Sequence, residues 1–253
     1  MSPTLTPTLF IGHGSPTNAI EDNEFSREWI NIGQELPTPK AILCISAHWV
    51  TNDSNVTGDS NPKQINDFYG FPQELYAKKY PVVGDIALAK KVANATGAIL
   101  NSDWGIDHGT WSVLSRLFPK ADIPTIQFSL DINKTPQQHW DIAKKLAQFR
   151  QEDILIIGSG NVVHNLGLIE WSDTGFDWAT KFDQNIKNII LSNDFDNLIN
   201  YQNLENNELA IPTSEHFLPL LYILALKQDH EKIDFRCEKV TMGSMSMRSL
   251  IIK

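Results

Sequence analysis

The chain has 253 residues and a formal net charge of −9, with 42% hydrophobic and 20% charged residues. This composition is typical of a globular protein and excludes disordered and fibrous classes. The acidic balance, without any basic cluster, argues against a nucleic-acid-binding surface and against an anionic-membrane surface. A small neutral or aromatic ligand fits better.

The sequence also indicates the cellular compartment of the protein. No apolar run approaches the roughly 18 residues of a membrane span, and the first residues lack the pattern of a signal peptide. The two cysteines are Cys44, which lies in a predicted core strand, and Cys237. We therefore expect free thiols, no membrane partner and a reducing, cytoplasmic location.

The first half of the chain alternates apolar runs with amphipathic segments. In chain order they predict a strand over residues 7–12, a helix over 18–33, a strand over 41–48, a loop or edge hairpin over 50–62, a helix over 83–95 and a strand over 98–100. Gly33 and Gly97 follow the two helices, as glycines at helix ends do. Residues 67–72 pack three aromatic residues around a glycine and a proline, and predict a stiff loop that either packs on the core or roofs a pocket.

The second half continues the alternation. It predicts a helix over residues 110–118, a strand over 124–130, a helix over 134–150, a strand over 154–157, a helix over 176–199 broken near 192–194, a helix over 214–227, and paired strands between 233 and 252. Thr135 is expected to cap its helix, with Pro136 at the first helical position. His139 and His230 lie on polar helical faces and are expected to be solvated.

Strands that alternate with helices indicate an α/β fold. We expect residues 1–253 to form a single domain, in which a central, largely parallel (mixed) sheet is flanked by helices. Ligands of such sheets bind in the crevice at the carboxyl ends of the strands.

Four of the seven histidines are expected at that edge. His13, His48 and His164 each follow a predicted strand, and His216 lies in the first turn of a predicted helix. Neutral imidazoles bind zinc, iron and copper, so a metal site is one interpretation, and ordinary core histidines are the other. The segment 158–160, Gly-Ser-Gly, is also compatible with an anion cradle, although it lacks the lysine and glycine pattern of a P-loop.

Six short motifs, in order along almost the whole chain, extend this pattern. They are Gly-His-Gly-Ser-Pro at 12–16, Ser-Ala-His-Trp at 46–49, Asp-Phe-Tyr-Gly-Phe-Pro at 67–72, Asp-His-Gly-Thr-Trp at 107–111, Gly-Ser-Gly-Asn-Val-Val-His-Asn at 158–165 and Glu-His-Phe-Leu-Pro-Leu at 215–220. With them the chain resembles the extradiol aromatic ring-opening dioxygenases of the DOPA-dioxygenase type.

The resemblance implies a set of site residues. His13, His48 and His216 would be metal ligands, and His164 would be a fourth ligand or an acid/base group. Glu215 is the alternative to His216. Adjacent residues on a helix diverge by about 100°, so both cannot face one ion, and the motif favours His216. His108 would orient substrate or oxygen.

The resemblance also implies an activity. The protein would open the ring of a catechol with O2 to give a muconic semialdehyde, with His164 as base and later acid, and Arg248 could meet a substrate carboxylate. Fe(II) would be the working metal, and Zn(II) could occupy the same three imidazoles in purified protein. A zinc hydrolase and a non-enzymatic metal-binding relative are the alternatives.

Overall fold

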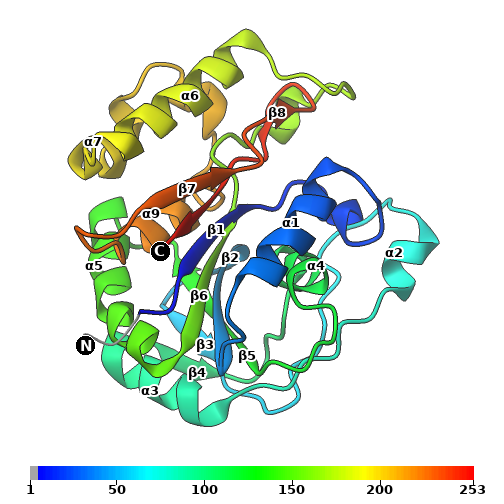
Figure 1. Cartoon of the computed structure of the whole chain (residues 1–253), viewed down its shortest axis with the longest axis vertical. Coiled ribbons are helices and arrows are strands. Elements are labelled where there is room, and N and C mark those ends of the chain that lie inside the picture. Colours follow the sequence, from blue (N-terminus) through cyan, green and yellow to red (C-terminus); the bar gives the residue numbers. More distant parts are fainter. Residues whose placement is uncertain (1–4) are drawn as a thin grey trace.

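The computed structural model describes residues 5–253, and an eight-stranded sheet runs through its centre (Figure 1). The strand order is β4-β3-β5-β2-β6-β1-β10-β7. These strands are β1 (Thr8–Gly12), β2 (Ala41–Thr51), β3 (Asn55–Thr57), β4 (Ile99–Asn101), β5 (Thr125–Asp131), β6 (Ile154–Gly160), β7 (Ile233–Arg236) and β10 (Ser249–Ile252). Two further short strands, β8 (Val240–Thr241) and β9 (Met245–Ser246), pair with each other.

The middle of the sheet is parallel. Strands β5, β2, β6 and β1 all run in the same direction, whereas β10 and β7 add an antiparallel edge beyond β1. Because β6 lies between β1 and β2, the carboxyl ends of these three strands meet at one edge. The predicted α/β fold with a largely parallel, mixed sheet is confirmed.

Helices cover both faces of the sheet. They are α1 (Glu24–Glu35), α2 (Gln73–Ala77), α3 (Ile86–Thr96), α4 (His108–Leu117), α5 (Pro136–Leu146), α6 (Asp177–Leu191), α7 (Phe195–Ile199), α8 (Asn207–Ala210) and α9 (Leu218–Leu224). Short 3-10 turns lie at Pro16–Ala19, Ala147–Glu152, Leu166–Leu168 and Tyr201–Asn203. Thr135 caps α5 as predicted, and the expected break separates α6 from α7.

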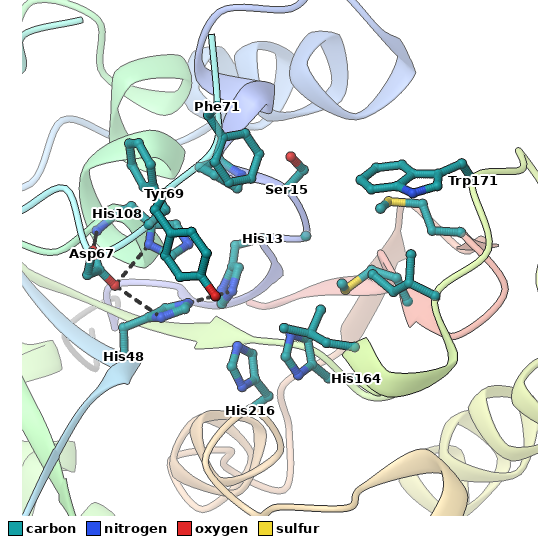
Figure 2. Close-up of a pocket in the computed structure, with 17 residues that line it drawn as sticks. His13, Ser15, His48, Asp67, Tyr69, Phe71, His108, His164, Trp171 and His216 are labelled. Carbon is teal, nitrogen blue, oxygen red and sulfur yellow. Dashed lines mark hydrogen bonds and ion pairs between the residues drawn. The ribbon is translucent and has the colours of Figure 1, made fainter. Parts of the chain in front are cut away.

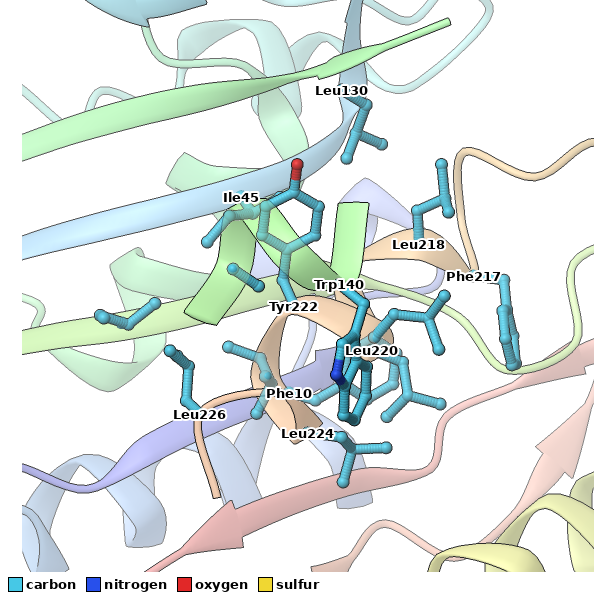
Figure 3. Close-up of a cluster of buried hydrophobic side chains, with 14 of the residues drawn as sticks. Phe10, Ile45, Leu130, Trp140, Phe217, Leu218, Leu220, Tyr222, Leu224 and Leu226 are labelled. Carbon is cyan, nitrogen blue, oxygen red and sulfur yellow. The ribbon is translucent and has the colours of Figure 1, made fainter. Parts of the chain in front are cut away.

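Alternating side chains of each strand supply two separate cores. In β1, Phe10 faces the core beneath α3, α5, α6 and α9, while Leu9 and Ile11 face the core beneath α1 and α4. Figure 3 shows the first of these cores, where Tyr222 and Leu220 of α9 pack beside Phe10. Because adjacent strand residues point to opposite faces, an uninterrupted apolar run is what a sheet covered on both sides requires.

The segment over residues 50–62 differs from its prediction. It contains β3, which is neither an edge nor part of a hairpin, because it lies between β4 and β5 with Val56 opposite Phe128. Val56 is fully buried. Three residues surrounded by Asn, Asp and Ser carry too little periodicity to reveal a strand that tertiary packing creates.

The helix predicted over 214–227 is also shorter than expected. It begins at Leu218, so His216 lies in the turn before α9 rather than in the first turn of a helix. Pro219 sits in the first turn of α9, where its missing N–H costs nothing. A start at residue 214 would have placed this proline inside the hydrogen-bonded part of the helix.

His139 was expected to be solvated, and this was wrong. The residue is fully buried on the inner face of α5, and its Nδ1 lies 2.9 Å from the hydroxyl of Tyr222. Among the helices of residues 5–253, none combines the length and apolar character needed to span a bilayer.

Candidate active site

The site is built at the carboxyl ends of the central parallel strands. His13 directly follows β1, and His48 lies in the second half of β2, where the pairing with β5 shifts its register between Ile45 and Val50. His216 reaches the same place from the turn before α9. A Cβ on Gly160, at the end of β6, would lie 2.1 Å from the carbonyl oxygen of His216, so only glycine allows this turn to approach. Figure 2 shows the three imidazoles around one cavity.

His13 and His48 turn their Nε2 atoms toward each other at a distance of 3.1 Å. The hydroxyl of Ser159 donates to the carbonyl of Gly109 at 2.5 Å, so its oxygen accepts from Nδ1 of His13 at 2.9 Å. Nδ1 of His48 lies 3.1 Å from Oδ2 of Asp67. With both Nδ1 atoms donating, two Nε2 lone pairs face each other, and a cation or a shared proton must lie between them.

His216 completes a near-equilateral set. Its ring centre lies 5.2 Å from that of His13 and 5.0 Å from that of His48, and the rings of His13 and His48 are 4.9 Å apart. Three imidazoles bound to one ion through bonds of about 2 Å hold their centres about 5 Å apart. Nε2 of His216 is buried and has no hydrogen-bond partner among the described residues. Ligand atoms within 4.8 Å of one another form two groups, one of His13, His48 and His108 and one of His164, Glu215 and His216. The residues present therefore fit a metal ion, and a site shared by His13, His48 and His216 would draw on both groups.

Glu215 acts on His216 from the other side. Its Oε1 lies 3.2 Å from Nδ1 of His216 and accepts a hydrogen bond from Thr213 Oγ1 at 2.6 Å. Glu215 and His216 both precede α9, so the divergence expected for neighbours on a helix does not separate them. The contact nevertheless leaves Nε2 of His216 as the nitrogen that is free to bind an ion, and gives the carboxylate an orienting position.

His164 stacks on His216. Their ring centres are 3.5 Å apart and their planes differ by 5°. A metal–imidazole bond lies near the plane of the ring, so an ion bound in the plane of His216 would lie outside the nearly parallel plane of His164. This geometry favours the acid/base role of His164 over the alternative role of a fourth ligand.

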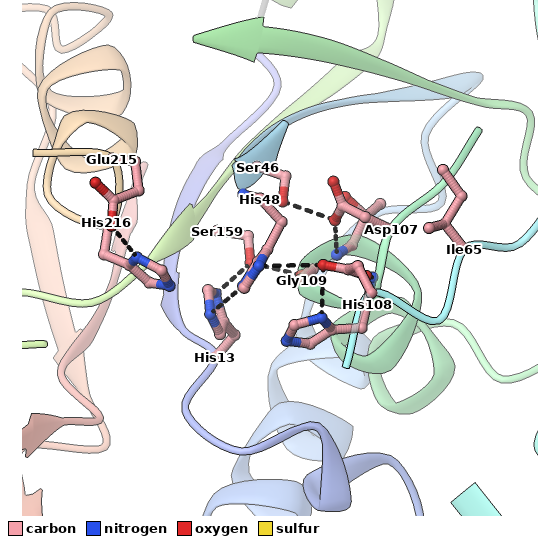
Figure 4. A network of polar contacts seen from close by, with 12 residues as sticks. His13, Ser46, His48, Ile65, Asp107, His108, Gly109, Ser159, Glu215 and His216 are labelled. Carbon is pink, nitrogen blue, oxygen red and sulfur yellow. Dashed lines mark hydrogen bonds and ion pairs between the residues drawn. The ribbon is translucent and has the colours of Figure 1, made fainter. Parts of the chain in front are cut away.

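His108 and His48 share one carboxylate oxygen. Oδ2 of Asp67 lies 2.9 Å from Nδ1 of His108 and 3.1 Å from Nδ1 of His48 (Figure 4). Oδ1 of the same carboxylate accepts the backbone N–H of His108 at 2.9 Å. Asp107 caps α4, which starts at His108, and accepts a hydrogen bond from Ser46 at 2.7 Å. His108 is thus held rigidly at the cavity.

Burial dominates the protonation of the site. It lowers the pKa of His13 and His216 well below the ordinary value, and the neighbouring imidazoles add to the effect. Burial also lowers the pKa of His164 to about 4. For His48, burial is outweighed by the hydrogen bond of Asp67 and the charges of the nearby carboxylates, so its pKa is raised. His13 and His216 are therefore neutral near pH 7 and ready for a metal, whereas His48 holds a proton more readily.

A cavity of about 600 Å³ opens in front of the histidines. Phe68, Tyr69 and Phe71 line one part of it, so the aromatic loop contributes to the pocket wall. Phe68 also packs on Trp111 and His108, so the same loop serves the core. A largely apolar wall with a few convergent polar groups is typical of a small-molecule site.

Sequence reasoning missed the supporting residues. Asp67 and Ser159 were parts of motifs without an assigned role, and Ser159 was also read as part of a possible anion cradle. The segment 158–160 instead lies inside β6 and is fully buried, so it does not form an anion cradle. Hydrogen bonds between residues as distant in sequence as His13 and Ser159 leave no local signal.

Three comparisons bear on this geometry. Residues 6–250 match the family model described as the catalytic LigB subunit of aromatic ring-opening dioxygenase. The chain is 43% identical to the 4,5-DOPA dioxygenase extradiol of Escherichia coli K12, over 100% of this chain and 96% of that protein. It is 34% identical to the protein of the same name from Beta vulgaris, over 96% of this chain and 94% of that one.

A solved structure agrees with the fold. The crystal structure of an uncharacterized protein from Escherichia coli K12 matches with a TM-score of 0.86 and 38% identity, and covers 98% of this chain and 100% of that chain. The family match spans nearly all of residues 5–253, including every histidine of the cavity. This chain therefore belongs to the LigB family of extradiol aromatic ring-opening dioxygenases.

Proposed function

We propose that the protein is a non-haem, metal-dependent extradiol dioxygenase that opens the ring of a DOPA-like catechol with O2 and yields a muconic semialdehyde. Residues 1–253 would form one catalytic domain. The observation that carries this proposal is the pair of Nε2 atoms of His13 and His48, 3.1 Å apart, with the third imidazole of His216 beside them.

His13, His48 and His216 would hold the ion, with Fe(II) as the working metal and Zn(II) as a redox-silent occupant of the same site. When bound, the iron supplies a Lewis acid for the catechol oxygens and a path for electrons between catechol and O2. Three neutral ligands leave the full divalent charge at the site. That charge favours ionised catechol oxygens.

His164 and His108 would handle protons and orientation. His164 lines the cavity, and its stacking on His216 keeps it next to the ligands without sharing their ion. Its imidazole would take a proton from a catechol hydroxyl and later return one to the product. His108, fixed through Nδ1 by Asp67, would orient substrate or oxygen in the same cavity.

The partners follow from the cavity and the composition. The aromatic wall fits a small aromatic diol, and the net charge of −9 supports neither nucleic acid nor membrane as a partner. Both cysteines are free thiols, which supports the cytoplasm as the site of action.

The test starts with anaerobic loading of the metal-free protein with Fe(II). A panel of catechols is added, air is admitted, and oxygen uptake and the visible absorption of a semialdehyde are followed. We expect uptake and colour with the native chain, and loss of both metal and activity in His216→Ala. The matched control is His230→Ala, which removes an exposed histidine outside the cavity.

Two outcomes would overturn the proposal. Ester or amide hydrolysis by the Zn(II) form, with no oxygen uptake for any catechol, would identify a zinc hydrolase. Stoichiometric metal binding with neither activity would identify a non-enzymatic relative.

A further inference from the structure

The cavity is larger than the ring of a catechol requires. Its volume is about 600 Å³, whereas an apolar cavity of about 150 Å³ already holds a benzene molecule. A catechol ring held at His13, His48 and His216 therefore leaves most of the cavity free. The residues that line this remaining space decide which substituent of the ring is bound.

Apolar side chains line the part of the cavity that lies away from His108 and Asp67. Figure 2 shows Trp171 in this part of the cavity. The surface, referred to below as the apolar wall, consists of Leu166, Ile169, Trp171, Met242 and Met245.

Two segments that are distant in sequence build the apolar wall together. His164 forms an antiparallel bridge with Met245. The backbone N–H of Glu170 donates to the carbonyl oxygen of Met242 at 3.1 Å, and the N–H of Met242 donates to the carbonyl oxygen of Ser172 at 2.9 Å. Because these backbone contacts hold the two segments side by side, their side chains form one continuous surface that begins next to His164.

The apolar wall extends from the interior to the solvent. Met245 is 3% exposed, whereas Leu166 and Trp171 are 63% and 86% exposed. Large apolar side chains that lie together beside a cavity are typical of a ligand-binding surface. An apolar group that covers them is removed from water on binding, while polar groups of the same ligand stay hydrated at the open mouth.

The cation that the sequence offered to a substrate lies elsewhere. Arg248 is 2% exposed and ion-paired with Asp183 and Glu238, and it does not line the cavity. The expectation that Arg248 meets a substrate carboxylate is therefore wrong. Binding at the apolar wall depends on apolar contact.

We propose that the apolar wall is a subsite for an apolar group carried by the side chain of a DOPA-like catechol, such as the acyl chain of an N-acyl DOPA. The inference rests on the proposed function and narrows its substrate class. DOPA itself remains a substrate, and the acylated compound keeps the carboxylate of DOPA. The acyl chain would lie along Trp171 and Met245 while the diol is held at the histidines.

The test uses derivatives of L-DOPA in which only the acyl chain grows: the N-acetyl, N-butanoyl and N-hexanoyl compounds. All of them carry the same carboxylate and the same neutral amide, so the charge of the ligand is constant. In the Fe(II) protein we expect kcat/KM to rise about 2-fold for each added methylene, against the roughly 4-fold of complete burial, because the wall stays partly exposed. Anaerobic calorimetric titration of the Zn(II) protein should give the same dependence of affinity on chain length without turnover.

Two variants compare the apolar wall with the rest of the cavity. Trp171→Ser should reduce the gain for each added methylene. Tyr69→Ser is the matched control, because Tyr69 is an aromatic residue of the cavity that is 91% exposed and lies outside the apolar wall. It should keep the gain for each methylene, whatever its effect on the N-acetyl compound.

The outcomes separate this inference from the proposed function. Equal kcat/KM and equal affinity across the series, or a dependence on chain length that Trp171→Ser leaves unchanged, would overturn the subsite and leave the dioxygenase proposal intact. Absence of cleavage for L-DOPA and for all of its derivatives would count against the dioxygenase itself. The calorimetric dependence on chain length would still decide the subsite in that case.

Discussion

Asp67 contacts two histidines of the site that have different proposed roles. One oxygen faces both Nδ1 of His48, a proposed ligand, and Nδ1 of His108, a proposed substrate-orienting group. Burial opposes the charge of this carboxylate, but the two histidine hydrogen bonds outweigh it and hold its pKa well below the usual range. It therefore remains an anion that polarises both rings.

We predict that Asp67→Asn weakens metal binding by about tenfold or more, because an amide keeps the shape of the group but not its charge. Competition with a coloured chelator measures the affinity, and thermal unfolding shows whether the fold is kept. Asp103→Asn, at an exposed aspartate, is the matched control. Unchanged affinity in Asp67→Asn would show that His48 does not depend on this partner.

His139 gives a second prediction at this scale, one concerning stability. Burial lowers its pKa to about 4, whereas an unfolded chain keeps a value near 6.5. Above pH 6.5 both states are neutral and the residue contributes nothing to the pH dependence. As the pH falls from 6.5 toward 4 the unfolded state binds the proton first, so stability is lost, by up to about 3 kcal/mol.

Urea unfolding of the metal-free protein at pH 7.5 and pH 5 measures this effect. His139→Gln should lose less stability between the two pH values than the native chain, whatever its stability at pH 7.5. His230→Ala should behave like the native chain, since that side chain is exposed. If His139→Gln lost as much stability between pH 7.5 and pH 5 as the native chain does, the prediction would be contradicted.

At the scale of elements, the sequence predicted the strands and helix ends that have a local sequence pattern. It missed features that depend on tertiary packing. Apolar runs before His13 and in 154–157 identified β1 and β6, because strands covered on both faces need uninterrupted apolar side chains. Thr135 and Pro136 likewise marked the start of α5. These signals are local and independent of the rest of the fold.

β3 and the start of α9, which both differ from the prediction, lack such signals. β3 exists because β4 and β5 flank it, and its polar Asn55 and Thr57 are buried by that pairing. The start of α9 depends on Pro219, and with it the orientation of His216 relative to Gly160. The strand-end positions of the histidines could therefore be predicted, but not the parallel stacking of His164 on His216 on which its proposed acid/base role rests.

At the scale of the whole molecule, one end of the sheet carries the candidate site and the opposite end carries contacts that stabilise the fold. The carboxyl ends of β1, β2 and β6 carry the histidines, and segments preceding β1 and β6 are tied together by Arg150. Its guanidinium donates to the carbonyl oxygens of Thr6 and Leu226 at 2.8 and 2.7 Å and pairs with Glu231. This side chain is 1% exposed.

We predict that Arg150→Met destabilises the protein by about 3–5 kcal/mol, because Glu231 is left buried without its cation and two carbonyl groups lose their donor. The double variant Arg150→Met/Glu231→Leu should recover part of that loss, since removing both charges removes the unpaired one. Urea unfolding measures both values. Metal affinity of the folded variants should stay at the native level, because the pair lies among segments that do not line the cavity. A loss of metal affinity matching the loss of stability would show instead that the two ends of the sheet are coupled.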